Sequence, residues 1–173
     1  MSARRVSVTA ISIAIVTVMV SVVKIPIPAT GGFWHLGVIA EAFLAVAFGP
    51  AIGAVSAGVG AALADLFGGF GSFAPLTLLA HGATGLIIGL LAWKKGLIGM
   101  IFGLIVGGAA QVAIYFFGEA TVYGFGLPGA IGELSLNLIQ VGFGFFGLVL
   151  FGVVKYVYPR IEDLAEDPTF EEV

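Results

Sequence analysis

Long apolar segments separated by short breaks make up most of the chain. Between Arg4 and Tyr156 the sequence is almost continuously apolar. An α-helix needs about 20 apolar residues to cross a bilayer, and fewer when it lies inside a bundle. The pattern therefore predicts an all-α integral membrane protein with six transmembrane helices. They cover residues 6–23, 35–48, 51–67, 74–93, 97–117 and 129–156.

The breaks between these segments contain residues that end helices. Two prolines and a pair of glycines within residues 24–34 predict an extended loop, because proline removes a backbone donor and disfavours helix in the residue before it. The other breaks are a tight turn at Gly49-Pro50, a flexible loop at 68–72 and a polar, aromatic loop at 118–128.

Composition excludes a soluble protein. Hydrophobic residues make up 60% of the chain and charged residues 10%, whereas soluble domains have about 25% charged residues. No basic patch exists to bind nucleic acid, and there is no cysteine. The first apolar run exceeds the apolar region of a signal peptide, which favours a transmembrane helix. We expect a transmembrane domain at 1–156 and a solvated acidic cytoplasmic tail at 157–173.

Positive charge predicts the orientation, because loops rich in Lys and Arg stay in the cytoplasm. With both termini inside, only Lys24 lies outside. The same orientation places Asp65, Glu119 and Glu133 at or near the outer face. The remaining basic residues are then all cytoplasmic: Arg4, Arg5, Lys94, Lys95, Lys155 and Arg160.

Small residues repeat at helical spacing and predict close helix contacts. Two of these stripes are expected to pack within the bundle. On the first helix, Ser7, Ala10 and Ala14 either pack inside the bundle in the same way or receive a partner helix. The two internal stripes are Gly53, Ala57 and Ala61, and Gly99, Gly103 and Gly107.

Polar residues inside the apolar segments are candidates for function, because they are costly to bury in a membrane. Glu133, Asn137 and Gln140 share one face of the last helix, since they lie at positions i, i+4 and i+7. Two explanations stay open: a helix cap with interhelical hydrogen bonds, or an outward-open pocket for a small polar ring. The pocket would also include Trp34, His35, His81, Tyr115 and Tyr123.

Other functions fit the sequence less well. No set of residues suits nucleophilic catalysis or a metal site, and no Walker A motif is present. Glu41 has three open explanations: a protonated side chain, a pair with His81, or a position near a partner surface. A stand-alone carrier or channel would need an ion pathway through Glu41, His81 or Asp65, and no inverted repeat is visible. A membrane scaffold would bind no ligand at all.

Four ordered segments resemble a known family. They are residues 31–37 (GGFWHLG), 48–53 (FGPAIG), 58–65 (GVGAALAD) and 74–78 (APLTL). Together with the polar face of the last helix, they are similar to the S components of energy-coupling factor (ECF) vitamin transporters. The riboflavin and hydroxymethylpyrimidine types are the most similar, and the resemblance covers residues 6–155.

The resemblance implies a six-helix subunit of a prokaryotic cell membrane that captures a vitamin under its first outer loop. It implies docking on a T subunit coupled to two ATPases, which use the ATP, so this chain needs no cofactor of its own. The family docks through an A-x-x-x-A motif, which is Ala10 to Ala14 here.

The sequence departs from the family pattern at two places near the expected pocket. Residues 35–38 are HLGV where the family often has NLGD, and residues 81–85 are HGATG where it often has KGLEG. The vitamin therefore does not follow from the resemblance. Glu133 suits a ring with amino donors, which favours a pyrimidine or thiamine-like ligand over a carboxylated one.

Overall fold

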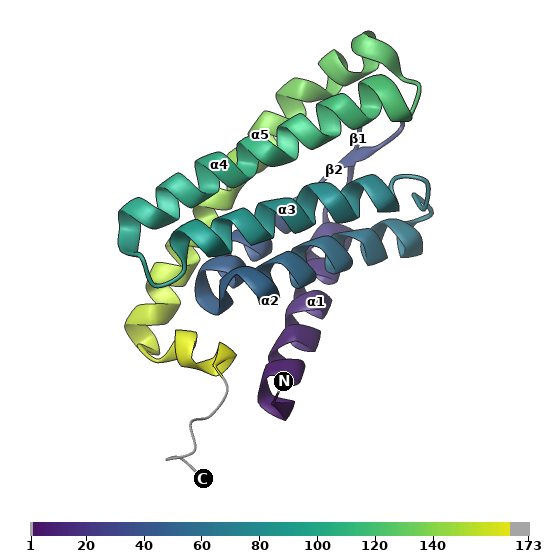
Figure 1. The fold of residues 1–173 in the computed structure, drawn as a ribbon. Helices are drawn as coiled ribbons and strands as arrows, with labels where there is room; N and C mark the ends of the chain where they lie inside the picture. The colour runs from purple at the N-terminus through teal and green to yellow at the C-terminus, as the bar shows by residue number, and fades with distance from the viewer. Residues whose placement is uncertain (1, 167–173) are drawn as a thin grey trace.

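The computed structural model describes residues 2–166. Nearly all of them are helical, as the apolar pattern predicts, and a short antiparallel ribbon links the first two long helices (Figure 1). In chain order the elements are α1 (Ala3–Val22), β1 (Ile25–Pro26), β2 (Phe33–Trp34), α2 (Gly37–Gly68), α3 (Ala74–Ala92), α4 (Gly96–Phe117), the π-helical η1 (Gly118–Val122), α5 (Gly126–Val157) and the 3₁₀ helix η2 (Ile161–Ala165).

A sharp break divides α2 into two halves. Gly49 has φ 81° and ψ −176°, and Pro50 follows it. A Cβ atom on Gly53 would lie 2.8 Å from Cβ of Ala45, so the chain folds back on itself as the sequence predicts. The first half, residues 37–48, is about 18 Å long at about 1.5 Å per residue, which is shorter than the apolar thickness of a bilayer.

This break changes the count of spanning helices. Within residues 2–166, five helices are long and apolar enough to cross a membrane, and α2 is one of them. The sequence predicted six separate spans. The structure does not confirm that number, because α2 counts once among the five although its two halves, which match the segments predicted at 35–48 and 51–67, fold back on each other at Gly49.

Glycines let the helices approach closely at the centre of the bundle. A Cβ atom on Gly85 of α3 would lie 2.2 Å from the backbone oxygen of Gly53 of α2. On α4, a Cβ atom on Gly103 would lie 3.2 Å from the backbone oxygen of Ile88 of α3. The two glycine stripes therefore pack within the bundle, as predicted. Helix α5 packs against both α2 and α4 and closes the arrangement.

Helix α1 lies at the edge of the bundle (Figure 1). Its buried face, which includes Val16 and Val20, packs on α2, where Gly60 leaves room for Val16. Ser7, Ala10 and Ala14 are exposed on its other side. These three small residues of α1 are therefore left out of the packing inside this chain.

Charged residues separate to the two ends of the bundle. The end that includes Lys94, Lys95 and Lys155 is called the basic end here. At that end Lys94 pairs with Glu166, and Lys155 Nζ lies 2.5 Å from Glu162 Oε2. This grouping agrees with the predicted cytoplasmic side.

The C-terminal segment differs from the solvated tail predicted from its charges. Helix η2 packs against α1 and α2 at the basic end, with Ile161 and Ala165 buried. Two apolar side chains within an acidic segment are enough to hold it on the bundle, while its carboxylates face lysines. The rest of the predicted tail, residues 167–173, lies outside the described part of the chain.

Candidate ligand-binding site

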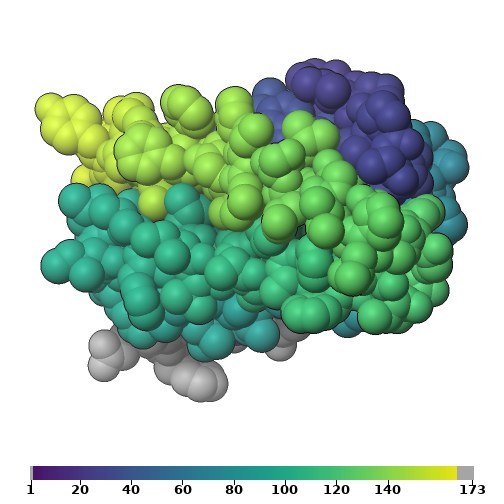
Figure 2. Space-filling view, turned by 90° about the horizontal axis from the view of Figure 1, so that it is seen from above, coloured from purple at the N-terminus to yellow at the C-terminus, as the bar shows by residue number. Residues whose placement is uncertain are grey.

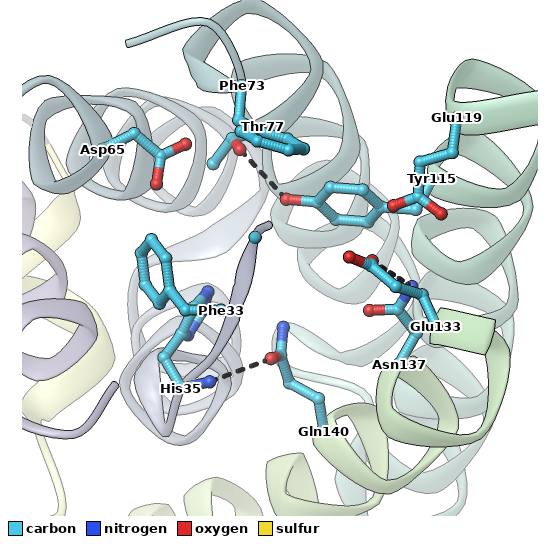
Figure 3. A pocket seen from close by; sticks show the side chains of 11 residues that line it. Phe33, His35, Asp65, Phe73, Thr77, Tyr115, Glu119, Glu133, Asn137 and Gln140 are labelled. Carbon is cyan, nitrogen blue, oxygen red and sulfur yellow. Dashed lines mark hydrogen bonds between the residues drawn. The ribbon is translucent and has the colours of Figure 1, made fainter. Parts of the chain in front are cut away.

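A cavity lies at the end of the bundle opposite the basic end, called the pocket end here. Its volume is about 30 Å³, enough for two or three water molecules. Side chains from α2, α3, α4, η1 and α5 converge on it together with the α1–α2 loop (residues 23–36), as Figure 3 shows. The lining residues are Gly32, Phe33, His35, Asp65, Phe73, Thr77, Tyr115, Glu119, Glu133, Asn137 and Gln140.

The α1–α2 loop covers the cavity. Strands β1 and β2 pair with Ile25 opposite Trp34, and Gly31 turns the chain between them with φ 74°. Figure 2 shows this segment in purple-blue beside the green start of α5. A Cβ atom on Gly32 would lie 3.2 Å from Oε1 of Glu133. Glycine is needed here because the backbone lies directly over that carboxyl group.

One wall of the cavity is the polar face of α5. Glu133, Asn137 and Gln140 are all buried and all line the cavity, so the predicted shared face exists. The Thr30 hydroxyl donates to Oε1 of Glu133, and Asn137 Nδ2 lies 3.5 Å from its Oε2. This wall therefore binds the covering loop through side-chain acceptors.

His35 joins the covering loop to α5 and faces the cavity as a neutral ring. Its backbone N–H donates to Gln140 Oε1 at 3.1 Å. Its Nδ1 accepts the backbone N–H of Gly37 at 3.1 Å, which requires an unprotonated Nδ1. Burial lowers the pKa of His35 well below its usual value, and the nearby His81 and Lys24 lower it further.

The opposite wall combines aromatic rings with hydroxyl and carboxyl groups. The Tyr115 hydroxyl donates to Thr77 Oγ1 at 3.1 Å, and Asp65 lies beside Thr77 (Figure 3). Phe73 stacks on Tyr123 with ring centroids 5.6 Å apart. A flat ligand would find ring faces on this wall and hydrogen-bond partners on both walls of the cavity.

Three carboxyl groups line the cavity, those of Asp65, Glu119 and Glu133. No Lys or Arg is among the lining residues of the described chain. Lys24 lies nearby, but its Nζ is 4.6 Å from the centroid of the Phe33 ring and bonds the backbone oxygen of Ala64. Within residues 2–166 no three His, Cys, Asp or Glu side chains gather closely enough to hold a metal ion. The lining therefore favours a ligand that donates hydrogen bonds.

Five of the eight residues predicted for the pocket line the cavity: His35, Tyr115, Glu133, Asn137 and Gln140. The other three do not. Trp34 turns away, and its ring meets the edge of Phe143 with centroids 5.2 Å apart. Tyr123 stacks behind Phe73, and its hydroxyl donates to the backbone oxygen of Ser72 at 2.8 Å. His81 lies deeper, with its ring against Tyr115.

The structure settles which partner Glu41 has. His81 Nδ1 lies 2.8 Å from Glu41 Oε2, and both side chains are fully buried. The pair with His81 was one of the three explanations left open by the sequence. The pair uses one atom of each side chain, and Glu41 Oε1 and His81 Nε2 have no hydrogen-bond partner within the described residues.

Sequence reasoning missed several lining residues. Asp65 and Glu119 were expected at or near the outer face, but they were not placed in the pocket. Thr77 gave no signal, because a threonine in an apolar helix usually bonds its own backbone. Gly32 and Phe33 belong to the predicted loop, whose path over the cavity depends on the β1–β2 pairing.

Comparisons with known proteins agree with this geometry. A family model described as "ECF-type riboflavin transporter, S component" matches residues 1–157. The chain is 36% identical over 146 residues to an uncharacterized protein of Pyrococcus woesei, covering 84% of this chain and 95% of that one. It is 30% identical over 163 residues to the thiamine precursor transporter HmpT of Lactococcus lactis subsp. cremoris, covering 92% and 88%.

A solved structure has the same fold. It is described as the S component of a bacterial ECF transporter, and it superposes with a TM-score of 0.62 at 21% identity. The match covers 94% of this chain and 98% of that one. The likeness shows that the two chains share a fold.

Proposed function

The chain belongs to the family of ECF-type riboflavin transporter S components, and from this premise we propose that its cavity captures an amino-substituted nitrogen heterocycle of the vitamin-precursor type. One observation supports this most directly. Buried carboxyl and amide groups of α5 face aromatic rings across a cavity that a loop covers. Such a site holds a flat ring by stacking and reads its edge by hydrogen bonds.

The acidic lining favours a pyrimidine with amino groups over a flavin. Carboxylates accept hydrogen bonds and donate none. The pyrimidine-like edge of riboflavin has two carbonyl oxygens, which carboxylates repel, whereas an aminopyrimidine offers N–H groups. The thiamine precursor transporter that is 30% identical to this chain supports the same substrate class.

A ligand of this size requires the α1–α2 loop to move. The cavity of about 30 Å³ holds no six-membered ring, and the loop closes it through Thr30 and His35. Loop opening admits the ligand, and reclosure replaces the bond between Thr30 and Glu133 with ligand contacts. Loops that cover ligand sites commonly gate binding in this way.

Delivery to the cytoplasm depends on partner subunits. The proposed docking face is the exposed stripe of Ser7, Ala10 and Ala14 on α1, whose small side chains allow a T-subunit helix to approach closely. Two ATPase subunits bound to the T subunit supply the ATP energy, and this chain binds no cofactor.

Mass spectrometry of small molecules released by denaturing the purified protein tests the substrate class. We expect a near-stoichiometric aminopyrimidine or thiamine-like compound. Calorimetric titration with riboflavin, thiamine and 4-amino-5-hydroxymethyl-2-methylpyrimidine then ranks the candidates. Tighter binding of riboflavin would contradict the proposed class, and no binding of any of the three would contradict vitamin capture.

The energy source for uptake distinguishes a stand-alone carrier from the proposed subunit of an ATP-driven transporter. Uptake into proteoliposomes should require the T subunit, the ATPases and ATP together. Uptake by the purified chain alone, driven by an ion gradient, would contradict the proposed dependence on partners.

A further inference from the structure

Glu119 is a buried acidic side chain that donates to and accepts from no backbone group of the described chain. It is 1% exposed and lines the cavity. Within residues 2–166 neither of its carboxyl oxygens has a hydrogen-bond partner. Buried polar groups are nearly always paired, so an unpaired carboxyl group that faces a cavity points to a ligand that pairs with it.

The π-helical turn η1 aims this side chain inward. After α4 the chain widens from the α-helical pattern, and the backbone N–H of Tyr123 donates to the oxygen of Gly118 five residues earlier. Gly118 packs against Leu76 of α3, since a Cβ atom there would lie 2.5 Å from its Cδ1. Glu119 lies in this turn and lines the cavity, and π-helical turns recur at functional sites.

Glu119 and Glu133 face the same space from different elements. Figure 3 shows the two carboxyl groups side by side, with the ring of Tyr115 on one side and Asn137 on the other. Glu133 already accepts hydrogen bonds from Thr30 and Asn137, whereas Glu119 accepts none. Two adjacent carboxyl groups without a nearby lysine or arginine do not both stay ionised unless a cation or several N–H donors lie between them; without such a ligand they share a proton.

We propose that Glu119 and Glu133 form a paired-carboxyl site that selects amino-substituted, positively charged heterocycles, with Glu119 as the specificity-determining residue. This inference rests on the proposed function, because it names the chemical group that the same cavity recognises. One carboxylate takes two parallel N–H donors from the amino group and a protonated ring nitrogen. The second takes the remaining amino hydrogen or the ring charge.

The same chemistry rejects an oxo analogue of equal shape. Replacing the amino group by a carbonyl puts an oxygen lone pair against a carboxylate and leaves a buried acceptor unpaired. Sites built around hydrogen bonds discriminate strongly against ligands that lack the matching group. The shape of the cavity alone does not separate the two compounds, because an amino group and a carbonyl oxygen are similar in size.

The test compares two probes on two proteins. The probes are 4-amino-5-hydroxymethyl-2-methylpyrimidine and its 4-oxo analogue, and the proteins are the wild type and Glu119→Gln. We expect the wild type to prefer the amino probe. The variant should bind the amino probe about 10- to 100-fold more weakly, because one charged hydrogen bond is removed. The ratio of its affinities for the amino and oxo probes should fall by a similar factor.

The controls separate specificity from folding. Asp163→Asn makes the same chemical change on an exposed carboxyl group at the basic end and should leave both affinities unchanged. Glu119→Asp keeps the charge and should retain the amino preference, with weaker binding to both probes. Thermal unfolding of each purified variant shows whether its fold is intact, and the ratio of the two affinities is independent of the folded fraction.

Each outcome decides one of the two proposals. An unchanged amino-to-oxo ratio in Glu119→Gln, with binding retained, would overturn the role of Glu119 and leave vitamin capture standing. A wild type that prefers the oxo probe or riboflavin would overturn the paired-carboxyl site and the amino-substituted substrate class, while capture of a nitrogen heterocycle would stand. A wild type that binds no probe would overturn the proposed function itself.

Discussion

Single residues divide the pocket end into groups that hold the loop closed and groups left for a ligand. Glu133 belongs to both, since it accepts the Thr30 hydroxyl and also faces the cavity. Gln140 fixes His35 through the backbone. The position of each polar group along α5 thus determines whether it contacts the loop, the ligand or both.

Glu133→Gln should weaken binding of the aminopyrimidine probe by about 100-fold or more, because it removes a buried charge from the ligand contact. The variant should still fold, because the amide oxygen still accepts the Thr30 hydroxyl hydrogen. The substitution should lower the free energy of unfolding by about 1 kcal/mol. Calorimetric titration measures the first effect and thermal unfolding the second. Unchanged affinity would remove Glu133 from the site.

Acid should destabilise the protein through His35. The unfolded chain takes up a proton on this ring near pH 6.5, but the folded chain resists it because burial lowers the pKa of His35. The resulting contribution to stability is present above pH 6.5 and is lost as pH falls below that value, by up to about 1.4 kcal/mol per pH unit.

Melting temperatures of the wild type and His35→Gln between pH 7.5 and 5.5 measure this effect. The wild type should lose more stability on acidification than the variant does. His81, Glu41 and Lys24 surround the ring in both proteins, so their contributions largely cancel. Parallel pH curves for the two proteins would exclude His35 as the cause.

The residues of the site were predictable where helical periodicity decides them. Glu133, Asn137 and Gln140 share a face by spacing alone, and burial at the outer end of a bundle follows. Glu119 was not predictable, because a π-helical turn rotates it into the cavity and no pattern in the sequence marks that turn. Trp34 was wrongly expected to line the cavity, since the pairing of β1 with β2 turns its ring towards Phe143.

At the scale of elements, the positions of small residues predicted which helices pack closely. The apolar pattern did not predict the number of spanning helices or all of the helix ends. The turn at Gly49-Pro50 was predicted from two residues, and the chain does fold back there between the two halves of α2. Helix α5 begins at Gly126, before the predicted start at residue 129, and η1 occupies the first part of the predicted loop. Hydrophobicity locates a helix core better than it locates either end.

Helix α1 supports a prediction about docking. Ala10→Trp or Ala14→Trp should abolish ATP-dependent uptake and leave ligand affinity unchanged, because both positions are exposed on the bundle and far from the cavity. A tryptophan there keeps a partner helix from approaching. Uptake by reconstituted transporter and titration of the isolated chain measure the two effects.

Val149→Trp is the matched control for these variants. It adds the same bulky side chain to an exposed apolar position on α5. Uptake should remain near the wild-type level in this control. Normal uptake in the Ala10 and Ala14 variants would place the docking face elsewhere.

At the scale of the whole molecule, charge and function lie at opposite ends. The basic end contains the lysine and arginine residues that favour the cytoplasm, and some of them pair with carboxylates of the C-terminal segment. The pocket end contains the cavity and the three carboxyl groups that line it. The orientation predicted from the sequence therefore makes the cavity face outward. That placement suits capture from outside the cell.

Labelling on intact cells tests this orientation. The chain has no cysteine, so single cysteines report without background. Ser72→Cys, in the loop after α2, should react with a membrane-impermeant maleimide, and Lys95→Cys, between α3 and α4, should react only after permeabilisation. The reverse pattern would invert the orientation and place the cavity inside.

The hydrogen bond between Thr30 and Glu133 determines which solutes fail to bind. The protein's own hydroxyl acts as an internal competitor for the carboxylate, so every incoming compound must displace it. The apparent affinity of any compound for this carboxylate is its intrinsic affinity multiplied by the fraction of molecules in which the competitor is not bound. Sugars and alcohols offer only another hydroxyl and gain nothing by the exchange. Only compounds with stronger hydrogen-bond donors than a hydroxyl therefore replace Thr30 on this carboxylate.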